Sequence, residues 1–245
     1  MSAPGRPRGE SFEGRREGGP VSALADRLRV LVVAALGLLV AACASGPPPP
    51  DWQMNARQAI EAAVAAYLEG NARVEAAETA RARSEIARTG RPELLARAEL
   101  IRCAARVASV VFEPCEGFER LRADAAPAEL AYADYLAGRL RPQDIALLPE
   151  PHRAVAGAKA GPAADAALGA IDDPLSRLIA AGVLFRSERA SPQTLQIAVD
   201  TASAQGWRRP LLAWLKLQLM RAEQAGDGAE ADRLRRRIGV VQGGP

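Results

Sequence analysis

Few residues in this chain have side chains that could carry out chemistry, and they are widely spaced. There is one histidine, His152, and there are three cysteines, Cys43, Cys103 and Cys115. A single histidine excludes a metal site built from several histidines and weakens any catalytic triad that uses histidine as its base. His152 follows the proline-broken segment 149–151, and we expect it to be an exposed loop residue rather than a catalyst.

Pairs of acidic residues are the remaining candidates for catalysis. Asp172 and Asp173 are adjacent, and Glu113 lies close to Glu116. A glycosidase needs only two carboxylates, so a hydrolase that uses such a pair stays open. Asp173 is better explained as a helix cap, because Pro174 follows it at a favoured first helical position. The chain has no phosphate-binding loop, nucleophile elbow or His-Glu metal motif, so we expect a protein that is not an enzyme and has no cofactor.

Cys43 lies at the end of a segment that is typical of secretory signal peptides. Arg27 and Arg29 come first, an uncharged apolar run from Val30 to Ala42 follows, and small residues lead into the cysteine. A membrane-spanning helix needs about 20 apolar residues, and this run is shorter. A packed helix is also disfavoured, because four prolines at 47–50 follow and cannot continue it. The pattern indicates a signal peptide that is removed from the mature protein.

The last residues of that segment, Val40-Ala41-Ala42-Cys43, resemble the lipobox of bacterial lipoproteins. An aliphatic residue precedes two alanines and the cysteine. The resemblance implies that Cys43 begins the mature protein and carries acyl chains such as palmitate, which attach it to a membrane. Ala44 stands where an aspartate retains lipoproteins in the inner membrane of many enteric bacteria. The expected location is therefore the outer membrane, with the domain facing the periplasm.

Cys103 and Cys115 are expected to form a disulfide once Cys43 is lipidated. Disulfides persist in the periplasm, and these two cysteines are close in sequence. Cys103 falls on a predicted helix that ends near Val110, and the residues after it can return Cys115 to bridging range. The bond would contribute about 3 kcal/mol in the chain-entropy model. The alternative is a pair of unpaired, buried thiols.

The composition changes along the chain and divides it into four segments. Residues 1–20 are rich in Gly, Pro, Arg and Glu, and we interpret them as a disordered extension or a mis-assigned start. Residues 21–42 are the signal peptide. Residues 43–51 hold the lipid attachment site and a tether whose prolines favour extended polyproline II. Residues 52–245 are the folded domain.

The folded domain is predicted to be all-α. It is rich in Ala, Leu, Arg and Glu, which are strong helix formers, and aromatic residues make up only 4% of the chain. Runs of alternating β-branched residues are absent. The chain has a net charge of +3, and without the signal peptide its basic and acidic residues nearly balance. Because no clustered basic face is present, a nucleic-acid partner is not expected.

The first half of the domain, residues 52–112, is predicted to hold three helices. The first covers about residues 52–68, the second covers about 72–88, and the third begins at Pro92. The third helix has apolar residues on two sides, which is typical of a central helix. Its arginines are expected to be solvated or ion-paired rather than to bind an anion. These arginines are Arg97, Arg102 and Arg106.

The middle of the domain, residues 113–172, is the least regular part of the sequence. A short helix is predicted over about 127–138 and another over about 142–148. Prolines and glycines are frequent over 149–162, so we expect a loop-rich interruption that joins two helical halves.

Residues 173–240 are predicted to form two α-helical hairpins. Pro174, Pro192 and Pro210 are evenly spaced, about 18 residues apart, and each stands at a likely first helical position. A further interval leads to Gly228, which follows a possible capping residue. Each helix alone has too narrow an apolar stripe to be stable in water. Stacking of successive helices would bury these apolar stripes against one another and would bury Trp214.

The C-terminal pattern resembles tetratricopeptide repeats, which are helix–turn–helix units of about 34 residues. The resemblance rests on a large residue, a small residue and an aromatic at set spacing, and on the turn between helices. The matching positions are Leu178, Ala181, Gly182, Phe185, Trp214, Leu217, Gly226, Asp227, Ala229 and Ala231, with a fainter echo at Tyr67, Gly70 and Asn71. It implies stacked hairpins in a repeat-like array or bundle.

These features predict a non-catalytic scaffold, adaptor or assembly factor of the cell envelope, bound to the membrane by its lipid and to an unidentified envelope protein. One alternative is an envelope enzyme that acts on cell wall or glycan through carboxylates. Another is a helical protein that binds lipid or another small ligand. An exposed, concave apolar face would favour the scaffold. A cleft with converging carboxylates would favour the enzyme, and a closed apolar cavity would favour the lipid binder.

Overall fold

The structure is a computed structural model that describes residues 27, 29 and 49–243. The chain divides into two units, Met1–Pro49 and Pro50–Pro245. The predicted lipidation site, Cys43, lies outside the described residues, as does the predicted signal peptide apart from Arg27 and Arg29. Every regular element in the described part of the chain is a helix, which confirms the predicted all-α fold.

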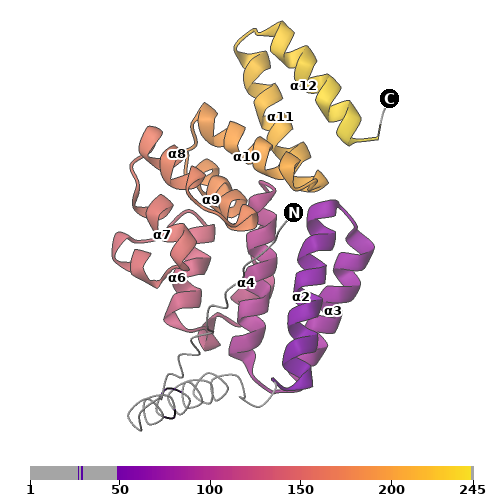
Figure 1. Ribbon diagram of the computed structural model, residues 1–245, viewed down its shortest axis with the longest axis vertical. Coiled ribbons are helices and arrows are strands. Elements are labelled where there is room, and N and C mark those ends of the chain that lie inside the picture. The colour runs from indigo at the N-terminus through magenta and orange to yellow at the C-terminus, as the bar shows by residue number, and fades with distance from the viewer. Residues whose placement is uncertain (1–26, 28, 30–48, 244–245) are drawn as a thin grey trace, which may run out of the picture. The chain divides into compact units, whose positions relative to one another are not determined.

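The first three helices of the folded unit agree with the predicted ones. They are α2 (Asp51–Glu69), α3 (Ala72–Ala87) and α4 (Pro92–Ala108). Gly70 ends α2 with a φ of 91°, a conformation that glycine adopts without a steric penalty. The side chain of Asn71 accepts a hydrogen bond from the backbone N–H of Val74 and caps α3. A two-residue turn therefore makes α2 and α3 an antiparallel hairpin, and both helices pack on α4 (Figure 1).

The predicted central position of the third helix is confirmed. Helix α4 packs against α2, α3 and the later helices α6 and α9. Its closest neighbour is α9 (Pro174–Arg186), which crosses it at Gly182. A Cβ atom added at Gly182 would lie 2.2 Å from the carbonyl oxygen of Val107. Because that oxygen belongs to the backbone, no larger residue fits at this position without moving one of the helices.

The three arginines predicted to be solvated or ion-paired on α4 all pair with carboxylates. Arg97 bonds to Glu129 at 2.6 Å, and Arg106 bonds to Glu75 at 3.1 Å. Arg102 pairs with Glu99 at 3.1 Å, and Arg83 also binds that buried carboxylate. The pKa of Glu99 is lowered, because the two arginines outweigh the effect of burial.

The middle of the domain is more helical than predicted. Pro149 is the N-cap of one helix, Pro151 lies in its first turn, and Pro162 opens the next helix. Proline is compatible with these positions because the first backbone N–H groups of a helix have no partner within it. The predicted loop over 149–162 was therefore wrong. The elements of this region are α5 (Glu116–Glu119), η1 (Arg122–Asp124), α6 (Pro127–Leu136), η2 (Pro142–Leu147), α7 (Glu150–Gly157) and α8 (Pro162–Gly169).

His152 is not the exposed loop residue that the sequence suggested. It lies on α7 with only 2% of its surface exposed. Its ring packs against Tyr132 and Tyr135, with ring centroids 5.5 and 5.1 Å away. The Tyr135 hydroxyl lies 3.4 Å from its Nδ1 atom. The prediction failed because the neighbouring prolines start a helix, and this helix turns His152 into the core.

The C-terminal helices follow one another and each packs on the next (Figure 1). They are α9, α10 (Pro192–Ala204), α11 (Arg208–Gln224) and α12 (Gly228–Val241). Pro174 and Pro192 stand first in their helices as predicted, whereas α11 begins before Pro210. Trp214 is fully buried, which confirms that prediction. The resemblance to tetratricopeptide repeats stays a prediction.

Side-chain caps set the starts of these helices. Asp173 accepts a hydrogen bond from the backbone N–H of Ser176 at 2.7 Å, so its predicted role as a cap is confirmed. Ser191 and Thr194 form a reciprocal capping box at the start of α10. At α12 only one of the two capping-box hydrogen bonds forms: Asp227 accepts from the backbone N–H of Glu230. The Glu230 carboxylate pairs instead with an arginine one turn later.

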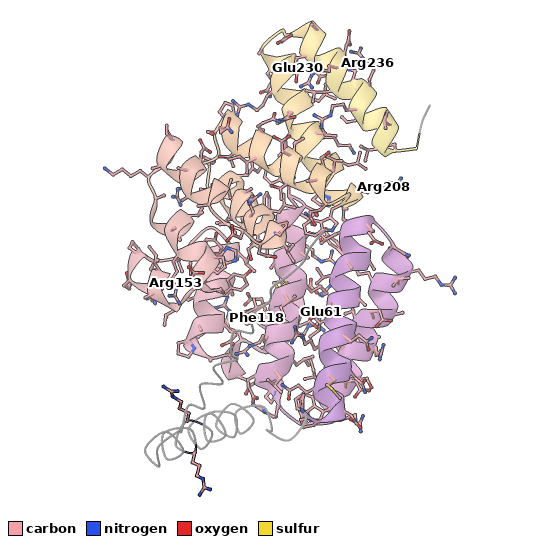
Figure 2. The ribbon with its side chains drawn as sticks, viewed as in Figure 1. Glu61, Phe118, Arg153, Arg208, Glu230 and Arg236 are labelled. Carbon is pink, nitrogen blue, oxygen red and sulfur yellow. A yellow bond between two sulfur atoms is a disulfide. The ribbon has the colours of Figure 1, made fainter. Side chains whose placement is uncertain are left out.

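The last helix presents a polar face to solvent. Arg233 pairs with Glu230, and Arg235 pairs with Glu223 and Asp232. Arg236 is also exposed, and Figure 2 shows it on α12 with Glu230. The opposite face of α12 is buried against α11 through Ala231, Leu234 and Ile238.

Candidate functional site

An open apolar groove runs between α2 and α4, with a volume of about 720 Å³. Its walls come from these two helices, and its end is formed by the start of α9 and the turn before α11. Most of the lining side chains are aliphatic or aromatic. They include Trp52, Ala56, Ile60, Val64 and Leu68 of α2, Ile86 of α3, Leu94, Ala98 and Ile101 of α4, and Leu175 and Trp207.

The groove arises because two apolar stripes face each other and no helix among the described residues covers them. On α2 the lining residues recur every four residues from Trp52 to Leu68, which places them on one face. On α4 they recur from Leu94 to Ile101. Ile60, Val64 and Ile101 stay partly exposed, although aliphatic residues at such spacing usually belong to a core.

A tryptophan lies near each end of the groove. Trp52 is in the first turn of α2, and Trp207 packs near the other end of that helix against the cluster of Tyr67 and Leu68. Arg209, two residues after Trp207, donates from Nε to the carbonyl oxygen of Tyr67 at 2.7 Å and ties α11 to α2. With a rise of 1.5 Å per residue, the stretch of α2 between these ends is about 24 Å long.

The charged residues at the groove already have partners. Arg57 and Glu61 pair across one turn of α2 at 2.8 Å, and Figure 2 labels Glu61 on that helix. Arg97 bonds to Glu129, as described above, and Asp173 caps α9. The charged side chains of the groove are therefore paired, and most of the remaining lining is apolar.

Cys103 and Cys115 lie at disulfide distance, with Cα atoms 5.9 Å apart. Cys103 is buried in the last turns of α4, and Cys115 is the residue before α5. The segment between them reverses direction at Val110, whose φ is 60°. The predicted return of the chain towards Cys103 is thus observed.

The acidic pairs considered for catalysis do not converge on a common site. Asp172 is exposed, and Asp173 caps α9. Glu113 and Glu116 are exposed at the edge of a second pocket, away from the groove, and Glu116 lies 3.4 Å from Arg120. The described residues hold no group of three or more His, Cys, Asp or Glu side chains that could bind a metal ion.

No helix in the described part of the chain has the length and apolarity required to cross a membrane. Comparison of the chain with protein-family models, curated proteins and solved structures gives no match. The groove was not predicted from the sequence, although apolar residues recur at helical spacing over 52–68. Such a stripe predicts burial, but which neighbour covers it depends on the tertiary structure.

Proposed function

We propose that this protein is a lipid-anchored adaptor of the bacterial cell envelope. Cys43 holds it in the outer membrane, and its periplasmic domain binds a helical segment of a partner protein in the groove between α2 and α4. It acts as a scaffold and catalyses no reaction. The observation that carries this proposal is the open, partly exposed apolar lining of the groove.

The proposed anchor is supported by residues on both sides of Cys43. Val40 to Ala42 match a lipobox, and the prolines at 47–50 suit an extended spacer between membrane and domain. The closeness of Cys103 and Cys115 fits an oxidising compartment such as the periplasm.

The shape of the groove favours a helix as the bound segment. Because α3 returns the chain between them, α2 and α4 run in the same direction, and all three helices pack together. A fourth helix laid along the α2 and α4 stripes would complete a four-helix bundle. Apolar residues of such a helix at positions i, i+3, i+4 and i+7 would meet Ile60, Val64 and Ile101. Trp52 and Trp207 would supply rigid aromatic anchors at its two ends.

The two other functions receive less support. An envelope hydrolase needs carboxylates that converge on a cleft. Asp173 caps a helix, and of the carboxylates that line the second pocket, Glu116 pairs with Arg120 and Glu119 with Arg122. A lipid carrier encloses its ligand, and this groove is open along one side.

The first test concerns the anchor. Mass spectrometry of the protein from its native envelope is expected to show a mature N-terminus at Cys43 that carries acyl chains, and fractionation should place it with the outer membrane. A Cys43→Ser variant is expected to lose the lipid and to leave the membrane fraction. An unmodified Cys43 behind an uncleaved leader would disprove the anchor, and recovery in the inner membrane would disprove the location.

The second test concerns the groove. A photo-crosslinking amino acid at Ile101 is expected to give a covalent adduct with an envelope protein, mapped to an amphipathic helix of that protein. The same probe at Val240, which is 67% exposed on α12, serves as the matched control and should give no such adduct. Adding an Ile60→Asp substitution should reduce the Ile101 adduct at least about tenfold without lowering Tm, because Ile60 is partly exposed in the groove.

Two results of this experiment would contradict the adaptor function. Equal protein adducts at Ile101 and Val240 would mean that the groove is not the contact surface. Adducts of Ile101 with phospholipid alone would replace the adaptor by the lipid-binding alternative.

A further inference from the structure

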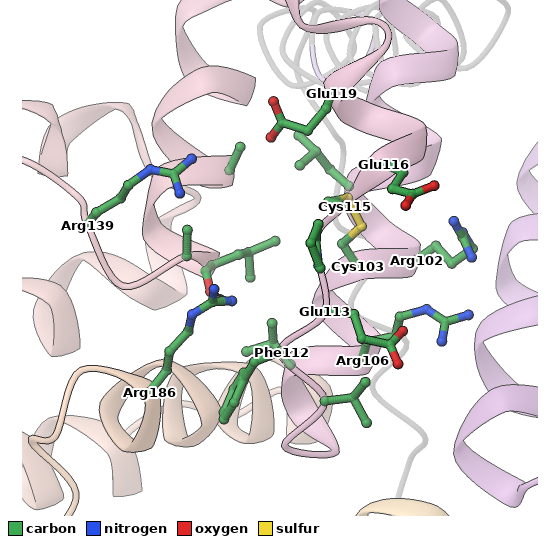
Figure 3. A pocket seen from close by; sticks show the side chains of 17 residues that line it. Arg102, Cys103, Arg106, Phe112, Glu113, Cys115, Glu116, Glu119, Arg139 and Arg186 are labelled. Carbon is green, nitrogen blue, oxygen red and sulfur yellow. Dashed lines mark hydrogen bonds between the residues drawn. A yellow bond between two sulfur atoms is a disulfide. The ribbon is translucent and has the colours of Figure 1, made fainter.

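A second pocket of about 720 Å³ lies on the other side of α4, next to Cys103 and Cys115 (Figure 3). Its floor is formed by α4 and by the segment that links α4 to α5. Its opposite wall comes from α6 and from two arginines, Arg139 and Arg186. The volume is within the range of small-molecule sites, and the lining is half polar, unlike that of the groove.

Arg186 has an unusual environment for a charged residue. It is partly buried, and Nη1 donates to the carbonyl oxygen of Leu136 at 3.3 Å. Its guanidinium lies 5.3 Å from the centre of the Phe112 ring. None of the described residues gives it a carboxylate partner, whereas Arg102 and Arg106 on the opposite wall each have one.

Arg139 extends into the same pocket from the turn after α6. Figure 3 shows the side chains of Arg139 and Arg186 directed into the cavity from one wall. Arg139 is 59% exposed, and its Nε atom pairs with Asp134 at 3.1 Å. Burial and the nearby charge of Arg139 both lower the pKa of Arg186, so its positive charge is incompletely compensated.

An anion bound between these two guanidinium groups would compensate the positive charge of the partly buried Arg186. Guanidinium donors match carboxylate and phosphate oxygens in geometry, and such charge-assisted hydrogen bonds are strong. Leu136, Phe112 and Val111 line the pocket beside the arginines and would contact an apolar part of the ligand. Glu113, Glu116 and Glu119 also line the pocket, with Glu119 within electrostatic range of Arg139, and their charges disfavour a ligand with many negative groups.

The backbone at the edge of the pocket sets the direction of Phe112. Val110 follows the end of α4 with a φ of 60°, a left-handed conformation that β-branched residues rarely adopt. The N–H of Val111 bonds to the carbonyl oxygen of Arg106 at 3.0 Å and holds this turn closed. The turn directs Phe112 towards Arg186 and Phe185. The ring centroids of Phe112 and Phe185 are 6.2 Å apart.

We infer that this pocket binds a small organic anion, with a carboxylate or phosphate group between Arg139 and Arg186 and an apolar part against Phe112 and Leu136. The site is separate from the groove and does not depend on the adaptor function or on the lipid anchor.

Calorimetric titration of the purified domain, Pro50–Pro245, with three probes tests the inference, because these residues form one compact unit. Phenyl phosphate and benzoate share an aromatic ring and differ in the anionic group, whereas benzyl alcohol is uncharged. At least one anion is expected to bind, at least about tenfold more tightly than benzyl alcohol. The stronger anion then identifies the natural ligand as a phosphate or a carboxylate. Equal binding of all three probes, or binding of none, would overturn the inference.

Substitutions locate the site. Arg186→Gln and Arg139→Gln are each expected to weaken anion binding at least about tenfold, because each removes a charged donor. Arg186→Lys keeps the charge without the planar fork and should bind with intermediate affinity. Arg235→Gln on α12 is the matched control and should leave binding unchanged. If Arg186→Gln fails to fold, the more exposed Arg139 decides the result. Unchanged binding in Arg139→Gln would then place the anion elsewhere.

Discussion

Replacing Trp214 by alanine is expected to lower the free energy of unfolding by about 3–5 kcal/mol. Trp214 is fully buried on α11 and is the largest completely enclosed side chain in the described part of the chain. Its Nε1 atom donates to the carbonyl oxygen of Ala108 at 3.0 Å, across 106 positions of sequence. Its ring also meets the edge of Phe185 at a centroid distance of 6.1 Å. The substitution would leave a cavity where α4, α9 and α11 meet, and would remove the partner of a buried carbonyl group.

Urea denaturation followed by far-UV circular dichroism measures this change. Trp214→Phe is the matched control: it retains an aromatic ring but loses the indole hydrogen bond, and it should cost less than alanine. The competing interpretation is that Trp214 binds a partner. A Trp214→Ala variant that keeps its Tm but loses the crosslink at Ile101 would support that interpretation and refute the structural role.

Acidification is expected to destabilise the protein through His152. Burial disfavours the charged imidazolium and lowers the pKa of His152 from 6.5 to about 4, although Asp173 opposes this shift. Between these two pH values the unfolded chain binds a proton at His152 and the folded chain does not. The contribution of His152 to stability is therefore fully present above pH 6.5 and is lost as the pH falls to about 4. The shift corresponds to a loss of about 3 kcal/mol.

The difference in unfolding free energy between pH 7 and pH 4, measured by urea denaturation, checks this expectation. His152 is the only histidine of the chain, so a His152→Phe variant should lose most of the pH dependence between 6.5 and 4.5. Because the pKa of Glu99 is lowered, the contribution of Glu99 to stability is lost only at more acidic pH, below the ordinary value of 4.5. An unchanged slope in His152→Phe would show that other groups cause the acid sensitivity.

The positions of many helices could be predicted from the sequence because local signals set their ends. Pro92 opens α4, Gly70 ends α2, and Asp173 and Ser191 cap the helices that begin after them. The same signals were misread at Pro149, where closely spaced prolines suggested a loop. Proline in the first turn of a helix and proline in a loop have similar local sequence patterns. The spacing of the prolines therefore does not distinguish a helix start from a loop.

The sequence alone determined the all-α class, the helices on either side of the middle region, the burial of Trp214 and the approach of Cys115 to Cys103. These properties depend on helix propensity, apolar periodicity and short-range chain geometry, which can be read from neighbouring residues. Only the tertiary structure decided that His152 is buried, that the α2 and α4 stripes form an open groove, and that Arg139 and Arg186 share a pocket. Arg139 and Arg186 are far apart in sequence and come from different helical segments. Their proximity depends on how α4, α6 and α9 pack, including the close approach at Gly182, and no local pattern encodes it.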